Sequence, residues 1–144
     1  MSQKSEILNR IIHHLILNAS FTRNLGLLDG KMGICIFFYL YARQTGSKLY
    51  EELGGYLLDE IYKEIAQSAS IGFAKGLCGI AWGIEYLIQN NFVEADRDEV
   101  LEELDLKILE KDVTRVKDFS LDDGLKGIAY YVINSCLLYT SDAA

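Results

Sequence analysis

One short motif occurs three times in this chain and constrains its architecture more than any other feature. It reads Gly-x-x-Gly-Ile and lies at 30–34, 76–80 and 124–128. The first glycines of successive copies are 46 and 48 residues apart. A period in the forties is typical of repeat proteins, in which each unit packs on the next. The sequence therefore predicts three copies of one structural unit.

Each motif is followed by a segment that is apolar on nearly every side. These segments are 34–41, 80–88 and 128–133. A helix that is apolar all round is typical of a position that is buried all round, so we expect three inner helices. The chain contains no proline, so no proline interrupts a long helix.

The stretches that precede the inner helices are apolar on one face only, which predicts outer helices. Tyr56 lies beside the second apolar row, and Asp96 or Asp98 is expected to cap the third helix. Repeated hairpins of one buried and one half-exposed helix predict an all-α fold, either an α/α toroid or an open solenoid. Aromatic inner helices favour the toroid. The apolar rows are Leu8, Ile11, Ile12, Leu15 and Ile16; Leu49, Leu53, Leu57, Ile61 and Ile65; and Leu101, Leu104 and Ile108.

The two glycines of each motif have two interpretations. A tight turn into a buried helix needs positive φ and close backbone approach, which glycine permits. Alternatively, the amides at the helix N-terminus would hold an anion. The structural interpretation is favoured because the motif lacks the rest of a phosphate-binding loop and occurs three times. The pairs are Gly30 and Gly33, Gly76 and Gly79, and Gly124 and Gly127.

Few residues qualify as catalytic or metal-binding groups, and none is assigned such a role. Cys35 lies in the first inner segment and Cys78 within the second motif, and for both a small apolar filler is the favoured interpretation. With Cys136 they form an odd set without disulfide spacing, which predicts reduced thiols in the cytoplasm. His13 and His14 are adjacent on a helix, so their side chains diverge by about 100° and face solvent instead of sharing a metal.

Carboxylates gather beside the glycine motifs and along the third outer helix. Asp29, Asp122 and Asp123 precede a motif, where helix capping is favoured over the acid and base of an α/α-barrel glycosidase. The acidic run 94–110, which includes Glu102, Glu103 and Asp105, is expected to be a solvated helix face. Trp82 is expected in the core.

Charge and hydropathy exclude several partners. The chain has 14 basic and 21 acidic residues, a net charge of −7, and no basic run, so nucleic acid is not an expected partner. No apolar stretch reaches the roughly 18 residues of a membrane span, and the N-terminus has no signal-peptide pattern. We therefore expect a cytoplasmic protein without membrane insertion.

The three motifs, in register with matching helix types, resemble the lanthionine synthetase C-like family over about residues 27–132. The block 76–87, Gly-Leu-Cys-Gly-Ile-Ala-Trp-Gly-Ile-Glu-Tyr-Leu, is most similar to versions from gut Bacteroidetes. The resemblance implies a double layer of seven inner and seven outer helices, of which this chain holds about three units. It also implies a bacterial cyclase that forms thioether rings in ribosomally made precursor peptides, as in lantibiotic biosynthesis.

The chemistry implied by the resemblance adds a cysteine thiolate to a dehydroamino acid, with zinc lowering the thiol pKa. Family members hold zinc with a cysteine in a later repeat and a Cys-His pair in the following one. Neither motif occurs in this chain. We therefore expect zinc in the full-length protein and none bound by these residues. A peptide-binding toroid without zinc and a glycosidase remain as alternatives.

The last nine residues, 136–144, resemble the translation of a transposase sequencing adaptor. We accordingly expect residues 1–135 to be a partial toroid and 136–144 to be a non-native tail.

Overall fold

Six α-helices make up most of the chain, and no strand occurs among the residues that are described. The computed structural model describes residues 2–68 and 70–142, with side chains up to residue 136. A short 3₁₀ turn follows each of α1, α3 and α5, at Ala19–Phe21, Ile65–Gln67 and Val113–Arg115. The α-helices are α1 (Gln3–Asn18), α2 (Lys31–Thr45), α3 (Lys48–Glu64), α4 (Leu77–Gln89), α5 (Arg97–Leu109) and α6 (Leu125–Asp142).

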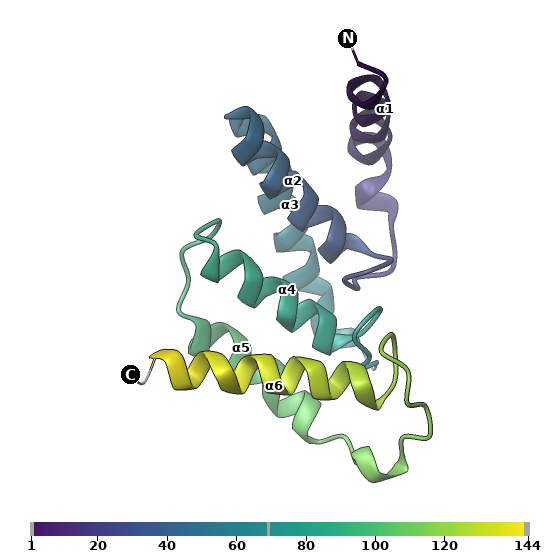
Figure 1. Ribbon diagram of the computed structural model, residues 1–144, viewed down its shortest axis with the longest axis vertical. Coiled ribbons are helices and arrows are strands. Elements are labelled where there is room, and N and C mark those ends of the chain that lie inside the picture. Colours follow the sequence, from purple (N-terminus) through teal and green to yellow (C-terminus); the bar gives the residue numbers. More distant parts are fainter. Residues whose placement is uncertain (1, 69, 143–144) are drawn as a thin grey trace.

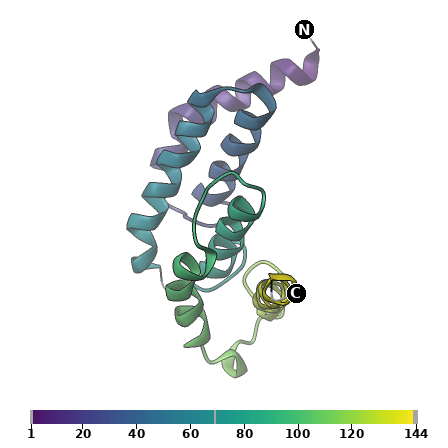
Figure 2. The same ribbon diagram turned by 90° about the vertical axis from the view of Figure 1, so that its left-hand side faces the viewer.

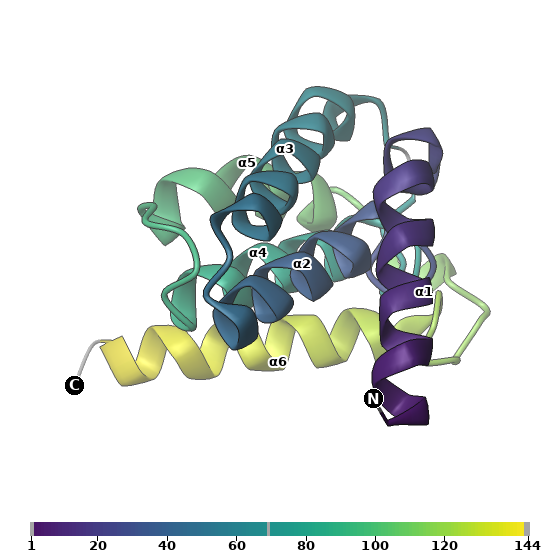
Figure 3. The same ribbon diagram turned by 90° about the horizontal axis from the view of Figure 1, so that it is seen from above.

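The inner helices α2 and α4 each form a hairpin with the outer helix that follows, α3 and α5 respectively. The inner helices α2, α4 and α6 follow one another in a single row, and α3 and α5 form a second row behind it (Figures 1 and 2). Helix α1 stands at one edge of the assembly (Figure 3). This arrangement of outer and inner helices confirms the predicted all-α fold of α/α-toroid repeats.

Local sequence explains where two of the outer helices begin. The Ser2 side chain accepts a hydrogen bond from the Ser5 amide at the start of α1. The Asp96 carboxylate accepts from the amides of Asp98 (3.0 Å) and Glu99 (3.3 Å) at the start of α5. Asp96, and not Asp98, is therefore the N-cap of that helix.

All-round burial of the inner helices is confirmed for α4 and is wrong for the other two. Helix α4 lies between α2 and α6 and is backed by α5, so almost all of its side chains are buried. Leu40 on α2 is 44% exposed, and Ile133 on α6 is 58% exposed. These helices each have an inner neighbour on one side only among the described residues, so their far flanks face solvent.

The predicted apolar row of α3 is partly wrong. Leu49 and Tyr56 are more than half exposed, while Gly54 and Leu58 are buried. A spacing of four residues advances about 40° beyond a full helical turn at each step, so a row of five cannot stay on one face. The buried row follows the true helical period and ends at Ile61.

Close approach to the preceding loop explains the glycines, and the predicted positive φ is wrong. Gly30 has φ −139° and Gly76 has φ −113°, both extended conformations open to any residue. A Cβ on Gly30 would overlap the Asn24 carbonyl oxygen, and a Cβ on Gly76 would lie 2.7 Å from the Ser70 carbonyl oxygen. The chain therefore needs glycine here because backbone crosses backbone.

The second glycine of the second and third motifs receives an apolar side chain from the unit before it. A Cβ on Gly79 would lie 2.9 Å from Leu27 Cβ, and a Cβ on Gly127 would lie 2.6 Å from Phe73 Cβ. Leu27 and Phe73 occupy the same position in their own units, 46 residues apart. The two junctions between units are thus built by the same contact.

Backbone hydrogen bonds reinforce these junctions. The Leu28 amide donates to the Ala74 carbonyl (3.0 Å), and the Ala74 amide donates to the Asp122 carbonyl (2.5 Å). These three residues occupy equivalent positions in successive units, so the loops form a ladder from one unit to the next. We call the glycine contact and this ladder together the unit junction.

Two glycine-to-alanine substitutions within helices should change stability in opposite directions. Gly79→Ala should lower the free energy of unfolding by about 3 kcal/mol, because its Cβ would lie 2.9 Å from Leu27 Cβ of the preceding unit and would also overlap the Phe73 carbonyl oxygen. Gly55→Ala should raise it by about 0.5–1 kcal/mol, because its Cβ meets only Tyr39 Oη at 3.5 Å and alanine favours helix. Urea unfolding followed by circular dichroism measures both. Equal effects would contradict the unit junction.

Candidate functional site

Equivalent residues of the three units line an apolar groove of about 510 Å³ on the inner row. Ile36, Trp82 and Tyr130 contribute one side, each from the same position on α2, α4 and α6. The loops before these helices contribute the other side. We call this surface the inner groove, and its lining residues are Leu27, Leu28, Gly33, Ile36, Phe73, Trp82, Leu121 and Tyr130.

Aromatic contacts hold the middle of the inner groove in place. The Phe73 ring meets Trp82 edge-on, with ring centroids 6.1 Å apart, and meets Tyr130 in the same way at 5.4 Å. Trp82 also stacks on Tyr86 at 5.4 Å. Trp82 is only partly buried, so its predicted place in the core is correct for one side of the ring, while the other side lines the groove.

The helix N-termini beside the groove have amides that already donate to the preceding loop. On α2, the Lys31 amide donates to Asn24 O at 2.8 Å. On α4 and α6 the equivalent amides, of Leu77 and Leu125, donate to Ser70 O and Asp118 O at 3.0 and 2.9 Å. These bonds occupy donors that an anion would require, which supports the structural interpretation of the glycines.

A buried ion pair joins the last two units. Glu85 on α4 is 2% exposed, and its carboxylate accepts from Arg97 Nε at 2.5 Å. Burial raises the pKa of Glu85, and the nearby guanidinium opposes that rise. Arg97 also donates to the Ser135 carbonyl oxygen at 3.1 Å, so it links α4, α5 and α6. The sequence pattern does not identify this pair, although the lone carboxylate of Glu85 in an apolar helix is a signal for a buried partner.

A second ion-pair cluster lies at the start of α2. Lys31 is 2% exposed, and its ammonium group lies 3.2 Å from the Glu60 carboxylate and 3.4 Å from that of Glu64. Both carboxylates lie on α3, so this cluster fixes α2 against the next outer helix. Its position between two packed helices indicates a structural role.

One residue of the acidic run on α5 is not a solvated group. Glu102 and Glu103 are exposed as predicted. Asp105 is half-buried and accepts a hydrogen bond from the Tyr131 hydroxyl at 2.5 Å. Burial, with Asp105 as a further cause, raises the pKa of Tyr131. This hydrogen bond joins α5 to α6. Its two partners are far apart in the sequence, so no local sequence pattern predicts it.

The two inner cysteines lie in the core. Both are 0% exposed, and Cys35 Sγ donates to the Gly54 carbonyl at 3.2 Å. Burial raises the pKa of each thiol to about 12, so neither Cys35 nor Cys78 is a thiolate at neutral pH. This environment suits the small apolar filler that the sequence predicts.

The donors that the structure describes do not form a zinc site. His13 and His14 are exposed on α1, where the Asn18 amide donates to the His14 carbonyl at 2.8 Å. No group of three or more His, Cys, Asp or Glu side chains in the described part of the chain could hold a metal ion. The two buried thiols also oppose ionisation, which zinc coordination requires.

The capping prediction fails for Asp29, the aspartate beside the first motif. The N-cap of α2 is Gly30, without a side-chain cap bond, so capping by Asp29 is wrong. Asp123 packs on Gly72, where a Cβ would lie 3.0 Å from Asp123 Cα. Asp29 and Asp123 belong to the first and third loops, and the second loop lies between them, which disfavours a glycosidase acid–base pair.

No helix in the described residues has the length and apolar character needed to cross a membrane.

The repeated hairpins, the glycine junctions and the inner groove define an α/α-toroid repeat protein. The family model described as lanthionine synthetase C-like protein matches residues 22–142. The chain therefore belongs to the lanthionine synthetase C-like family. Searches of curated proteins and of solved structures returned no match.

The thiols should differ sharply in reactivity. With a pKa of about 12, about one in ten thousand Cys35 or Cys78 side chains is ionised at pH 8. A thiol-reactive disulfide reagent should therefore modify one cysteine rapidly in the native protein, the exposed Cys136, and all three after unfolding. The Cys136→Ser variant should show no rapid reaction. Rapid modification of two thiols would contradict the core placement.

Proposed function

We propose that this chain forms part of a ring that binds a ribosomally made precursor peptide, and that the complete ring is a zinc-dependent cytoplasmic cyclase of bacterial peptide modification. The inner groove is the observation that carries the proposal. Its apolar surface repeats from unit to unit at Ile36, Trp82 and Tyr130. A repeating apolar groove suits an extended peptide, because successive side chains meet equivalent surfaces.

The unit junction supports continuation of the ring. Leu27 and Phe73 each cover a glycine of the following unit, while Leu121, the equivalent residue of the third unit, is 51% exposed. Gly33, the equivalent glycine of the first unit, borders the inner groove. A fourth Gly-x-x-Gly unit would cover Leu121 as Gly127 covers Phe73.

Zinc chemistry would belong to other units of such a ring. The donor set described above does not fit zinc, so these residues supply no step of thioether formation. The resemblance implies a cysteine and a later Cys-His pair in further repeats. A ring that lacks those donors is the second candidate, a peptide-binding toroid without catalysis.

Trp82 provides a direct readout of peptide binding, because it is the single tryptophan of the chain and lines the inner groove. A peptide with dehydroalanine and cysteine should shift its fluorescence in a saturable way. Leu121→Asp should weaken binding about tenfold, because it places a charge in the apolar groove. Phe119→Asp is the matched control, since Phe119 is 66% exposed and does not line the groove.

The fluorescence titration has one outcome that supports the proposal and one that contradicts it. Saturable binding that Leu121→Asp weakens and Phe119→Asp leaves unchanged supports the proposal. A fluorescence response to oligosaccharides and none to the peptide would contradict it and favour a glycosidase.

The cyclase part of the proposal is tested on the gene. Long-read sequencing through the codon for Ser135 should show about four more Gly-x-x-Gly units with a cysteine and a Cys-His pair. The 144-residue chain alone should bind no stoichiometric zinc in elemental analysis. Further units without those donors would favour the binding protein, and one tightly held zinc ion per chain would contradict our donor assignment.

A further inference from the structure

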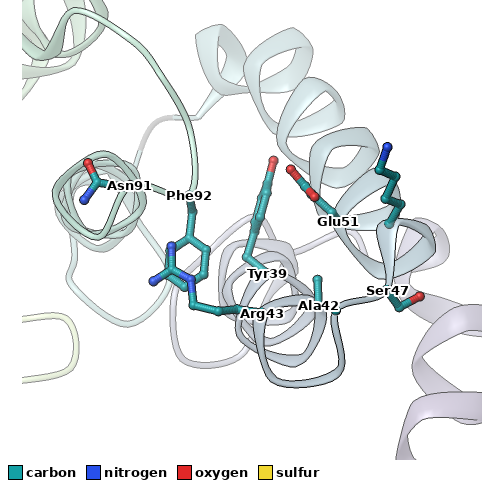
Figure 4. A pocket seen from close by; sticks show the side chains of 9 residues that line it. Tyr39, Ala42, Arg43, Ser47, Glu51, Asn91 and Phe92 are labelled. Atoms are coloured by element: carbon teal, nitrogen blue, oxygen red, sulfur yellow. The ribbon is translucent and has the colours of Figure 1, made fainter.

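A second pocket, of about 350 Å³, lies at the opposite end of the helices from the glycine loops. The C-terminal end of α2, the first turn of α3 and the loop after α4 enclose it. Figure 4 shows the Tyr39 ring between Arg43 and Phe92 on one side and Glu51 on the other. We call it the α2–α3 pocket. It shares no lining residue with the inner groove.

The Tyr39 hydroxyl is the most informative group in this pocket. The Tyr39 ring is largely buried, it lines the pocket, and its hydroxyl makes no hydrogen bond to any residue described in the structure. The ring is held in place, because a Cβ on Gly54 would lie 2.8 Å from Tyr39 Cδ2 and because Phe92 packs at a centroid distance of 5.8 Å. Because Tyr39 lines the pocket, its unbonded hydroxyl can donate to a ligand there.

Charged side chains without ion-pair partners also line this pocket. The Arg43 guanidinium lies 3.5 Å from the centroid of the Phe92 ring and donates to the Asn90 carbonyl at 2.5 Å, which fixes its position. Within the described chain, Arg43, Lys48 and Glu51 take part in no ion pair. The pocket therefore offers two cations and one carboxylate, in addition to the hydroxyl.

The contact between α4 and α5 contains a carboxylate that has no equivalent in the α2–α3 pocket. Glu85 occupies the position in α4 that Tyr39 occupies in α2, 46 residues earlier. Arg97 is the first residue of α5, as Lys48 is the first residue of α3. In the later junction a carboxylate meets the cation, whereas the earlier junction has a phenol and a cavity. A ligand carboxylate would restore the charge pairing.

We propose that the α2–α3 pocket binds a small zwitterionic α-amino acid with an apolar side chain. Its carboxylate accepts from the Tyr39 hydroxyl and pairs with Lys48, its ammonium group pairs with Glu51, and its apolar side chain lies toward Phe92. Burial raises the pKa of Tyr39 to about 12, so the hydroxyl keeps its proton at neutral pH and donates it to the ligand. The site is independent of peptide binding in the inner groove.

Isothermal titration calorimetry with four probes tests the ligand chemistry. L-leucine carries both charged groups, 4-methylpentanoate lacks the amine, 3-methylbutylamine lacks the carboxylate, and inorganic phosphate is a simple anion. We expect leucine to bind at least tenfold more tightly than each of the other three. No leucine binding below about 10 mM, or equal or tighter binding of phosphate or either half-molecule, would overturn the proposal.

Matched variants identify the residues. Tyr39→Phe should weaken leucine binding at least fivefold without lowering the melting temperature, because the hydroxyl has no partner in the protein. Glu51→Gln should remove the preference for leucine over 4-methylpentanoate. The controls are Tyr41→Phe and Glu52→Gln, neighbours that do not line the pocket. Unchanged affinity in Tyr39→Phe, or equal losses in variant and control, would overturn the assignment.

Discussion

The contact between an apolar side chain and the glycine of the next unit determines the geometry of this protein. Leu27 on Gly79 and Phe73 on Gly127 bring successive loops so close that their backbones hydrogen-bond directly, from Leu28 to Ala74 and onward to Asp122. No larger residue fits at these glycines. The spacing of the inner helices follows from this contact, and so does the alignment of their side chains along one surface.

Both pockets follow from how closely the units are held at each end. At the glycine end the junctions repeat, so equivalent residues line one continuous inner groove. At the far end the junctions differ: Glu85 meets Arg97 between α4 and α5, whereas Tyr39 faces a cavity between α2 and α3. Because its lining residues repeat, the inner groove suits an extended chain. Because the junctions at the other end differ from each other, the α2–α3 pocket suits one small molecule.

Sequence periodicity predicted the features that depend on one unit at a time. The three motifs, the alternation of inner and outer helices, the buried Cys35 and Cys78, and the Asp96 cap all follow from local pattern. Features that join residues from different helices were missed, because no local pattern specifies which side chains meet across a junction. The Tyr131–Asp105 bond, the Glu85–Arg97 pair and the α2–α3 pocket are of this kind. The predicted close backbone approach at the motif glycines is confirmed, and the predicted positive φ is wrong.

Amide hydrogen exchange of Leu28, measured by NMR, tests the unit junction most directly. The Leu28 side chain is 57% exposed and lies in a loop, so only the bond from its amide to the Ala74 carbonyl accounts for slow exchange. We expect the Leu28 and Ala74 amides to exchange as slowly as amides within α4. Exchange of Leu28 as fast as that of an unstructured loop would show that the units are not joined by this ladder.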